Sequence, residues 1–203
     1  MDNHRTEFDT ISGALCLSFA NAFNVDAGER HEEMLKEYAD LVEWAQTLEV
    51  IDFSTAQSLR HEANQHPDEA TAVLQSAWAL RQVLYGVFAA IAHQQSPAPT
   101  DLDALNTALS GMLSHHQIVS HEDGFSWGWD DTAALEQMIW PVIRDAADLL
   151  TGDSLERVGQ CANVRGCGWL FLDTSRNRRR RWCSMETCGN RAKVMRHYQR
   201  TKA

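Results

Sequence analysis

Four of the chain's five cysteines lie between Cys161 and Cys188, in the spacing C-x5-C-x15-C-x4-C. Each close pair can present two thiolates from a tight turn, and four cysteine ligands close a tetrahedral structural zinc site. The gaps within the pairs are wider than the commonest C-x2-C, so two disulfides or free thiols remain alternatives. We predict one Zn²⁺ per chain, bound by Cys161, Cys167, Cys183 and Cys188.

The run from Gly168 to Tyr198, GWLFLDTSRNRRRRWCSMETCGNRAKVMRHY, resembles the CGNR zinc finger, which is named for the tetrad at residues 188–191. Upstream, LCLSFANAF (Leu15–Phe23) and the helical middle of the chain resemble the ABATE domain. That domain precedes the finger in bacterial proteins described as stress-induced transcription regulators. The family usually carries Asp in this N-terminal box where this chain has Ser18, so no role of that carboxylate is transferred.

Charge divides the chain into two parts. From Arg157 to the end, 12 Lys and Arg residues stand against two acids, Asp173 and Glu186, which gives a net charge of +10. The preceding residues carry −20, and the whole chain carries −10. A basic end favours an anionic partner such as nucleic acid. We therefore expect an acidic domain over residues 1–153 and a basic finger over residues 154–203, each with its own core.

Apolar periodicity predicts a mainly α protein: a helical bundle with one β-hairpin, followed by a small C-terminal zinc finger with four cysteine ligands. The segment 68–94 is the longest and most apolar, so we place it at the centre of the bundle. The hairpin is predicted over 116–130, with Asp123-Gly124 at its turn. Further helices are expected over 8–24 and 38–48, from a cap at Asp52 or Ser54, and from Thr100. A last bundle helix is expected from a cap at Asp130 or Asp131, and Pro141 should kink it or mark a break near Trp140.

In the finger, Ser184 can cap a helix that runs to about Gln199. One arc of this helix carries Cys188, Arg191, Val194, Met195 and Tyr198, and we expect it to face the metal and the core. The opposite arc is basic, and together with the arginines before Cys183 it forms a candidate phosphate surface. The candidate nucleic-acid-binding residues are Arg176, Arg178, Arg179, Arg180, Arg181, Asn190, Lys193, Arg196, His197 and Arg200.

Other functions find little support in the sequence. It lacks the serine-hydrolase, Walker and zinc-protease motifs, and a site with four thiolates leaves no open position for water. His115, His116 and His121 flank the hairpin, but adjacent residues on a strand point to opposite faces and chelate poorly. No run of about 18 apolar residues predicts a membrane span, and the N-terminus has no apolar secretory region. We expect a cytoplasmic protein that is not an enzyme.

These observations predict a DNA-binding transcription regulator in which the finger is the reader and the helical domain is a sensor or dimerisation part. A small-molecule effector and a homodimer are both compatible with the sequence. Two alternatives use the same basic surface: a zinc-stabilised protein-interaction module and an RNA-binding protein.

Overall fold

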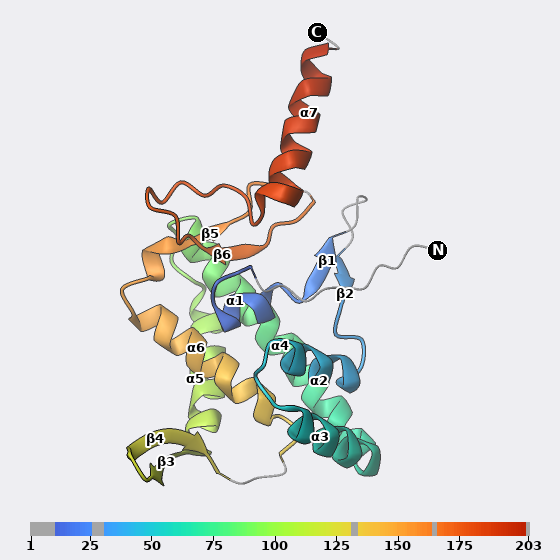
Figure 1. Ribbon diagram of the computed structural model, residues 1–203, viewed down its shortest axis with the longest axis vertical. Helices are drawn as coiled ribbons and strands as arrows, with labels where there is room; N and C mark the ends of the chain where they lie inside the picture. The colour runs from blue at the N-terminus through green and yellow to red at the C-terminus, as the bar shows by residue number, and fades with distance from the viewer. Residues whose placement is uncertain (1–10, 26–30, 131–133, 164–165, 202–203) are drawn as a thin grey trace.

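The computed structural model describes residues 11–25, 31–130, 134–163 and 166–201, and the predicted mainly helical class is confirmed (Figure 1). Within these residues, three short two-stranded antiparallel sheets accompany the helices. The helices are α1 (Leu15–Ala20), α2 (Tyr38–Thr47), α3 (Phe53–Gln65), α4 (Pro67–Ala92), α5 (Pro99–Leu113), α6 (Trp140–Thr151) and α7 (Asn190–Thr201). The strands are β1 (Phe23–Val25), β2 (His31–Glu33), β3 (His116–His121), β4 (Gly124–Trp129), β5 (Val158–Gln160) and β6 (Leu170–Leu172).

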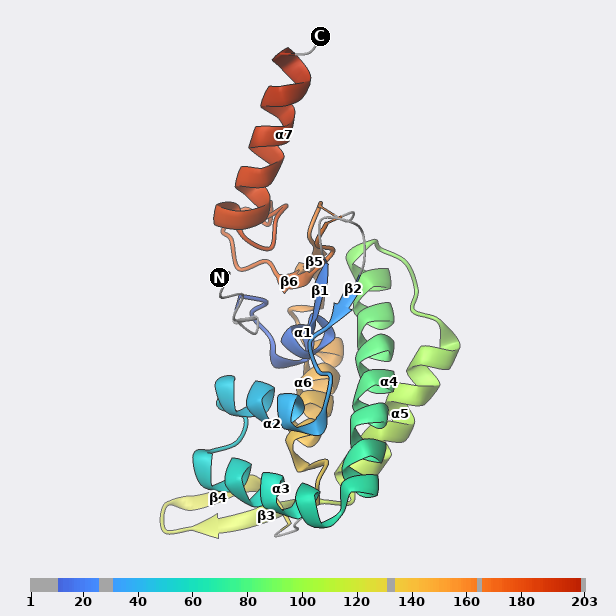
Figure 2. The same ribbon diagram turned by 90° about the vertical axis from the view of Figure 1, so that its right-hand side faces the viewer.

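Helix α4 is the centre of the bundle, as the sequence predicts. Helices α1, α2, α3 and α5 all contact it, and α5 lies along it in Figure 2. Pro67 stands in its first turn, where the missing N–H has no helical partner to lose. Its buried apolar side chains recur every three or four residues: Ala70, Leu74, Ala77, Leu80, Leu84, Val87 and Phe88. Among the described residues, no helix is both long enough and apolar enough to cross a membrane.

The helix predicted over 8–24 is wrong in extent. Helix α1 has only six residues, and the chain then enters β1, which pairs with β2. Every residue from 16 to 23 is buried. A run that is buried on all sides has no polar face, so its pattern cannot distinguish a helix from a strand. The beginning of the predicted helix lies outside the described residues.

Of the two effects expected of Pro141, a kink or a break near Trp140, the structure shows the break, because this proline opens a helix. A short 3₁₀ turn (Gln137–Ile139) precedes α6, and Pro141 is the second residue of α6. Of the two predicted caps, Asp131 lies outside the described residues. The backbone N–H of Asp130 instead donates to the carbonyl of His115 (2.8 Å), at the base of the hairpin.

The β3–β4 hairpin is confirmed, with its turn one residue earlier than predicted. His121 pairs with Gly124, so Glu122 and Asp123 form the turn. Gly124 opens β4 with φ +138°, a conformation that residues with a Cβ rarely adopt. Figure 1 shows the hairpin and α7 at opposite ends of the molecule.

The core of the bundle extends into the finger, while the four cysteines form a second, smaller cluster with Phe171. Strands β5 and β6 pair with each other, and they contribute Val158 and Leu170 to the core of the bundle. The side chain of Asn21, at the end of α1, donates to the Leu170 carbonyl and accepts from its N–H, both at 2.8 Å. On the same strand, the Leu172 N–H donates to the Ser12 carbonyl at 2.7 Å. The finger is therefore built directly onto the bundle.

This shared core predicts that Asn21→Ala destabilises the whole chain by about 2–4 kcal/mol, because two buried backbone groups of Leu170 lose their partner. Urea unfolding followed by circular dichroism should show one transition, shifted to lower urea. Asn106→Ala, at an exposed position on α5, is the control and should shift it little. Separate transitions for the finger and the bundle would contradict the shared core.

Candidate metal centre and nucleic-acid interface

The four predicted cysteine ligands come together in the structure. Their Sγ atoms all lie within 4.8 Å of one another, and none forms a disulfide. Cys167 and Cys183 are 3.4 Å apart at sulfur, and Cys183 and Cys188 are 3.7 Å apart. In a tetrahedral site with Zn–S bonds of about 2.3 Å, neighbouring sulfurs are about 3.8 Å apart. The cluster therefore fits one zinc ion.

The turns that present the cysteines differ between the two pairs. Cys161 follows β5, and Cys167 comes just before β6. The carbonyl of Asn163 accepts the N–H groups of Gly166 (3.1 Å) and Gly168 (3.2 Å), which closes the turn between them. In the second pair, the Ser184 hydroxyl accepts the N–H groups of Glu186 and Thr187 and caps the turn that carries Cys188.

Asn163 is a residue of the site that the sequence analysis missed. Its Nδ2 lies 3.9 Å from the sulfur of Cys188, so it provides a weak donor to that ligand. A donor in this position would orient the thiolate and stabilise its charge once the metal is bound. The signal in the sequence was an Asn two residues after the first cysteine, in a turn that contains two glycines.

Electrostatics favours a cation at the cluster. Hydrogen bonds from Cys167 and Cys183 lower the pKa of the Cys161 thiol. The same bonds, together with burial, raise the pKa values of Cys167 and Cys183. Four thiolates cannot occupy this buried space without a counterion, and a zinc ion would supply its positive charge there. All four would then be ligands, which leaves no open position for water.

The run of four arginines does not act as one uniform surface, because Arg180 is directed into the finger. Its guanidinium lies 4.4 Å from the centre of the Phe171 ring. Its backbone N–H donates to the carboxylate of Asp173 at 2.9 Å. The guanidinium also donates to the backbone carbonyls of Ile11, Leu172, Trp182 and Cys183. Arg180 thus holds the loop before the third cysteine against β6.

Asp173 fixes the other end of this loop. Burial alone would raise the pKa of its carboxyl, but hydrogen bonds from Ser175 and from the Arg180 amide lower the pKa below its ordinary value. Its Oδ1 accepts the Ser175 N–H at 2.8 Å. Asp173 therefore stays ionised and pins both ends of the segment 175–180.

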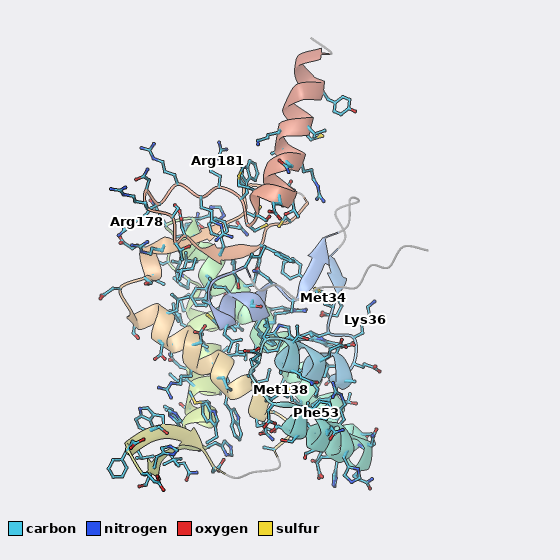
Figure 3. The ribbon with its side chains drawn as sticks, in the orientation of Figure 1. Met34, Lys36, Phe53, Met138, Arg178 and Arg181 are labelled. Carbon is cyan, nitrogen blue, oxygen red and sulfur yellow. The ribbon has the colours of Figure 1, made fainter. Side chains whose placement is uncertain are left out.

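The remaining arginines of the loop are exposed. Arg178 pairs with Glu156, and Arg181 lies over the Trp182 ring at 5.6 Å. In the part of the chain that the structure describes, Arg176, Arg179 and Arg181 have no carboxylate partner. Figure 3 shows Arg178 and Arg181 at the finger end of the molecule. The loop and the start of the turn that carries Cys188 line an open cavity of about 650 Å³: Ser175, Arg176, Asn177, Arg179, Arg180, Arg181, Trp182, Cys183, Ser184 and Met185.

Helix α7 extends away from the rest of the molecule (Figures 1 and 2). Of the arc predicted to face the metal and the core, Cys188 does face the cysteine cluster, but Val194, Met195 and Tyr198 are each more than half exposed. On the basic arc, Lys193 is exposed, and the Asn190 amide donates to the Glu186 carbonyl at 3.0 Å. Arg196, His197 and Arg200 belong to α7, but their side chains lie outside the described part.

The N-terminal box (Leu15–Phe23) is packed inside the protein and does not line an open site. Ser18 is buried within α1. The carboxylate that reaches this helix is Asp145 of α6, whose Oδ2 accepts the Cys16 N–H at 2.8 Å. Burial, and then the charge of Asp145, raise the pKa of the Cys16 thiol well above its ordinary value. The fifth cysteine is therefore a buried, unreactive thiol.

A helical bundle joined through a shared core to a four-cysteine finger defines a zinc-finger protein with an N-terminal helical domain. The CGNR zinc finger model matches residues 157–201. The ABATE model, described as "Putative stress-induced transcription regulator", matches residues 13–153, and the chain belongs to this family. A search of the curated proteins finds no match.

We predict that the purified chain carries one zinc ion, with four sulfur ligands at about 2.3 Å by X-ray absorption. Cys188→Ser should lose the metal, because three thiolates and a hydroxyl bind zinc less tightly. Cys16→Ser is the control and should keep it, since that thiol lies outside the cluster. The absence of stoichiometric metal from the unmodified chain, or a mass that shows two disulfides, would contradict the site.

Replacing Arg180 should destabilise the protein much more than replacing its neighbour Arg179. Arg180→Ala removes a charged donor from several carbonyls and should lower the free energy of unfolding by about 2–4 kcal/mol. Arg179→Ala changes an exposed side chain and should alter it by no more than about 0.5 kcal/mol. Urea unfolding of the zinc-loaded chains measures both, and equal effects would contradict the structural role of Arg180.

Proposed function

We propose that the chain is a transcription regulator that binds DNA through the arginine loop (residues 175–182) and the basic arc of α7. The observation that carries this proposal is the open cavity beside the zinc cluster. There, Arg176, Arg179 and Arg181 project from a loop that Arg180 and Asp173 hold in place. A fixed array of guanidinium groups suits phosphate oxygens, which accept paired hydrogen bonds. The family description supports the same conclusion.

The distribution of charge supports the finger, rather than the helical domain, as the part that binds DNA. The finger carries +10 and the preceding residues carry −20, so duplex DNA is attracted to one end of the molecule and repelled by the other. The expected contacts go to phosphates, and they position the protein without reading sequence. The proposed action is binding rather than catalysis, because the zinc would be enclosed by four thiolates.

The bundle offers a place for an effector. A cavity of about 520 Å³ opens between α2, α3 and α4. Its lining includes Tyr38 and Trp78 as aromatic walls, Lys36 and Arg60 as cations, and Glu37 as an anion. Because the cations outnumber the anion, this combination suits an aromatic or apolar molecule that carries an acidic group. Helix α4 runs from this cavity to the finger, where its Tyr85 hydroxyl donates to the Gly168 carbonyl at 3.0 Å.

The proposal predicts salt-dependent binding to duplex DNA. If the loop and α7 neutralise about four phosphates, the logarithm of affinity should fall with the logarithm of salt with a slope of roughly −4. Changing Arg179 and Arg181 together to Ala should reduce the slope by about two and weaken all sequences alike. Arg60→Ala, within the bundle, should leave the slope unchanged. Fluorescence anisotropy measures all three proteins.

The full chain is used in this experiment, because an isolated finger would lose the bundle contacts of Val158 and Leu170. Salt-independent binding, or no binding at low ionic strength, would contradict the proposal. Tighter binding to RNA than to a DNA duplex of the same sequence would instead favour the RNA-binding alternative.

The exposed apolar arc of α7 favours a second candidate, a protein-docking finger. Val194 and Met195 are 52% and 57% exposed on a helix that also carries basic residues. An acidic protein with an apolar groove would fit such a helix. Val194→Asp with Met195→Asp should abolish docking of that kind, whereas phosphate binding by the arginine loop would lose only a small, salt-dependent part.

A further inference from the structure

Another cavity, of about 300 Å³, lies between α4, α5 and α6 at the hairpin end of the molecule, away from the finger (Figure 1). It shares no lining residue with the cavity between α2, α3 and α4. Its floor is apolar, and none of the side chains that form it is more than 9% exposed: Ala77, Leu80, Met112, Ile139, Trp140 and Ile143. A volume at the small end of ligand pockets suits one ring system with a short side chain.

Gly111 of α5 lines this cavity, and no close contact explains its missing side chain. A Cβ at this position would meet nothing within 4 Å in the described part of the chain. By contrast, a Cβ at Gly86 of α4 would come within 2.8 Å of the Asp101 carboxylate, so a close contact accounts for that glycine. Glycine is one of the least favourable residues within a helix. At Gly111 it leaves open space at the cavity instead of making room for a neighbour.

The rim of the cavity carries side chains that accept hydrogen bonds. Glu136 is the charged residue of the lining, and among the described residues no Lys or Arg pairs with it. His115 also lines the cavity, with its ring stacked on Trp140 at 4.2 Å between ring centres. Its Nδ1 lies 3.1 Å from Oδ2 of Asp130. Because an ionised carboxylate can only accept, Nδ1 carries the proton and Nε2 of the neutral ring is an acceptor.

Arg144 is the basic residue of α6 closest in sequence to this lining, and it is directed elsewhere. Its guanidinium donates to Nε2 of His116 at 2.7 Å and lies 3.6 Å from the Asp148 carboxylate, and it is not part of the lining. The Ser114 hydroxyl, on the rim, donates to the Gly111 carbonyl at 2.6 Å, which leaves the hydroxyl oxygen free to accept. The described lining therefore offers one carboxylate and neutral acceptors, but neither Lys nor Arg.

We propose that this cavity binds a small aromatic or apolar amine, whose apolar part lies on the floor and whose ammonium group pairs with Glu136. An ammonium group has three N–H donors and no acceptor, which matches a rim of acceptors. Beside apolar side chains, the ion pair is screened less than it would be in water. An acidic molecule would meet the carboxylate of Glu136 without a cation to bind it. The proposal is independent of DNA binding by the finger.

Isothermal titration calorimetry of the zinc-loaded full chain tests the site with two probes of the same shape and opposite charge, tryptamine and indolepropionate. Tryptamine should bind with a dissociation constant of about 0.01–1 mM, as its size allows. Gly111→Leu fills the cavity and should weaken tryptamine binding by about tenfold or more, without weakening any binding of indolepropionate. Since leucine favours helix and its Cβ meets nothing, this variant should unfold at no lower temperature than the unmodified chain, which circular dichroism checks.

A charge-removing pair tests the role of Glu136. Glu136→Gln should weaken tryptamine binding by about fivefold or more. Glu43→Gln, at an exposed position on α2, removes the same charge elsewhere in the acidic domain and should leave binding unchanged. Equal effects of the two variants, or binding that persists in Gly111→Leu, would overturn the proposal. Binding that Gly111→Leu abolishes and Glu136→Gln leaves unchanged would overturn the assignment to an amine. No binding of tryptamine at about 10 mM also overturns the proposal.

Discussion

Four buried thiols within 4.8 Å of one another need a cation. Deprotonating them together in an enclosed space is opposed by their mutual repulsion, and a bound zinc ion removes that opposition. Zinc contributes roughly 10–16 kcal/mol to peptides of this kind, more than any other single interaction open to so small a domain. The turns around Asn163 and Ser184, and the start of α7, all take their positions from this one centre.

The cluster also depends on the bundle. Strand β6 lies between the two, because Phe171 faces the cysteines while Leu170 faces the bundle core. Asn21 pairs with the backbone of β6, and Gln160 on β5 donates to the Tyr85 hydroxyl of α4 at 2.8 Å. Each layer supports the next: the bundle holds the sheet, the sheet and the metal hold the cysteines, and Arg180 ties the arginine loop to both. A change at the bundle end of α4 therefore has a direct physical route to the loop.

The sequence predicted the parts of the fold that repeat or that have a fixed chemistry. Cysteine spacing identified all four ligands, and apolar periodicity identified α4. Prediction from the sequence failed where the same residue pattern fits two structures and only burial or packing decides between them. The run around Cys16 is buried on every side, so its pattern could not show that a helix would end after six residues. Arg179 and Arg180 are the same residue type in one charged run, and only the position of Phe171 and the nearby carbonyls makes one structural. The apolar arc of α7 resembles a core-facing arc, but among the described residues no element buries it.

Hydrogen–deuterium exchange on zinc-loaded and zinc-free protein tests most directly whether the metal centre and the bundle form one structure. Removing zinc should increase amide exchange through residues 160–191, which include β6, and also in α1, because Asn21 at its end bonds to the backbone of β6. Exchange in α5, which packs mainly on α4 and α6, should change least. If zinc removal instead left β5, β6 and α1 as protected as before, the finger would be an independent appendage, and the shared core of finger and bundle would be contradicted.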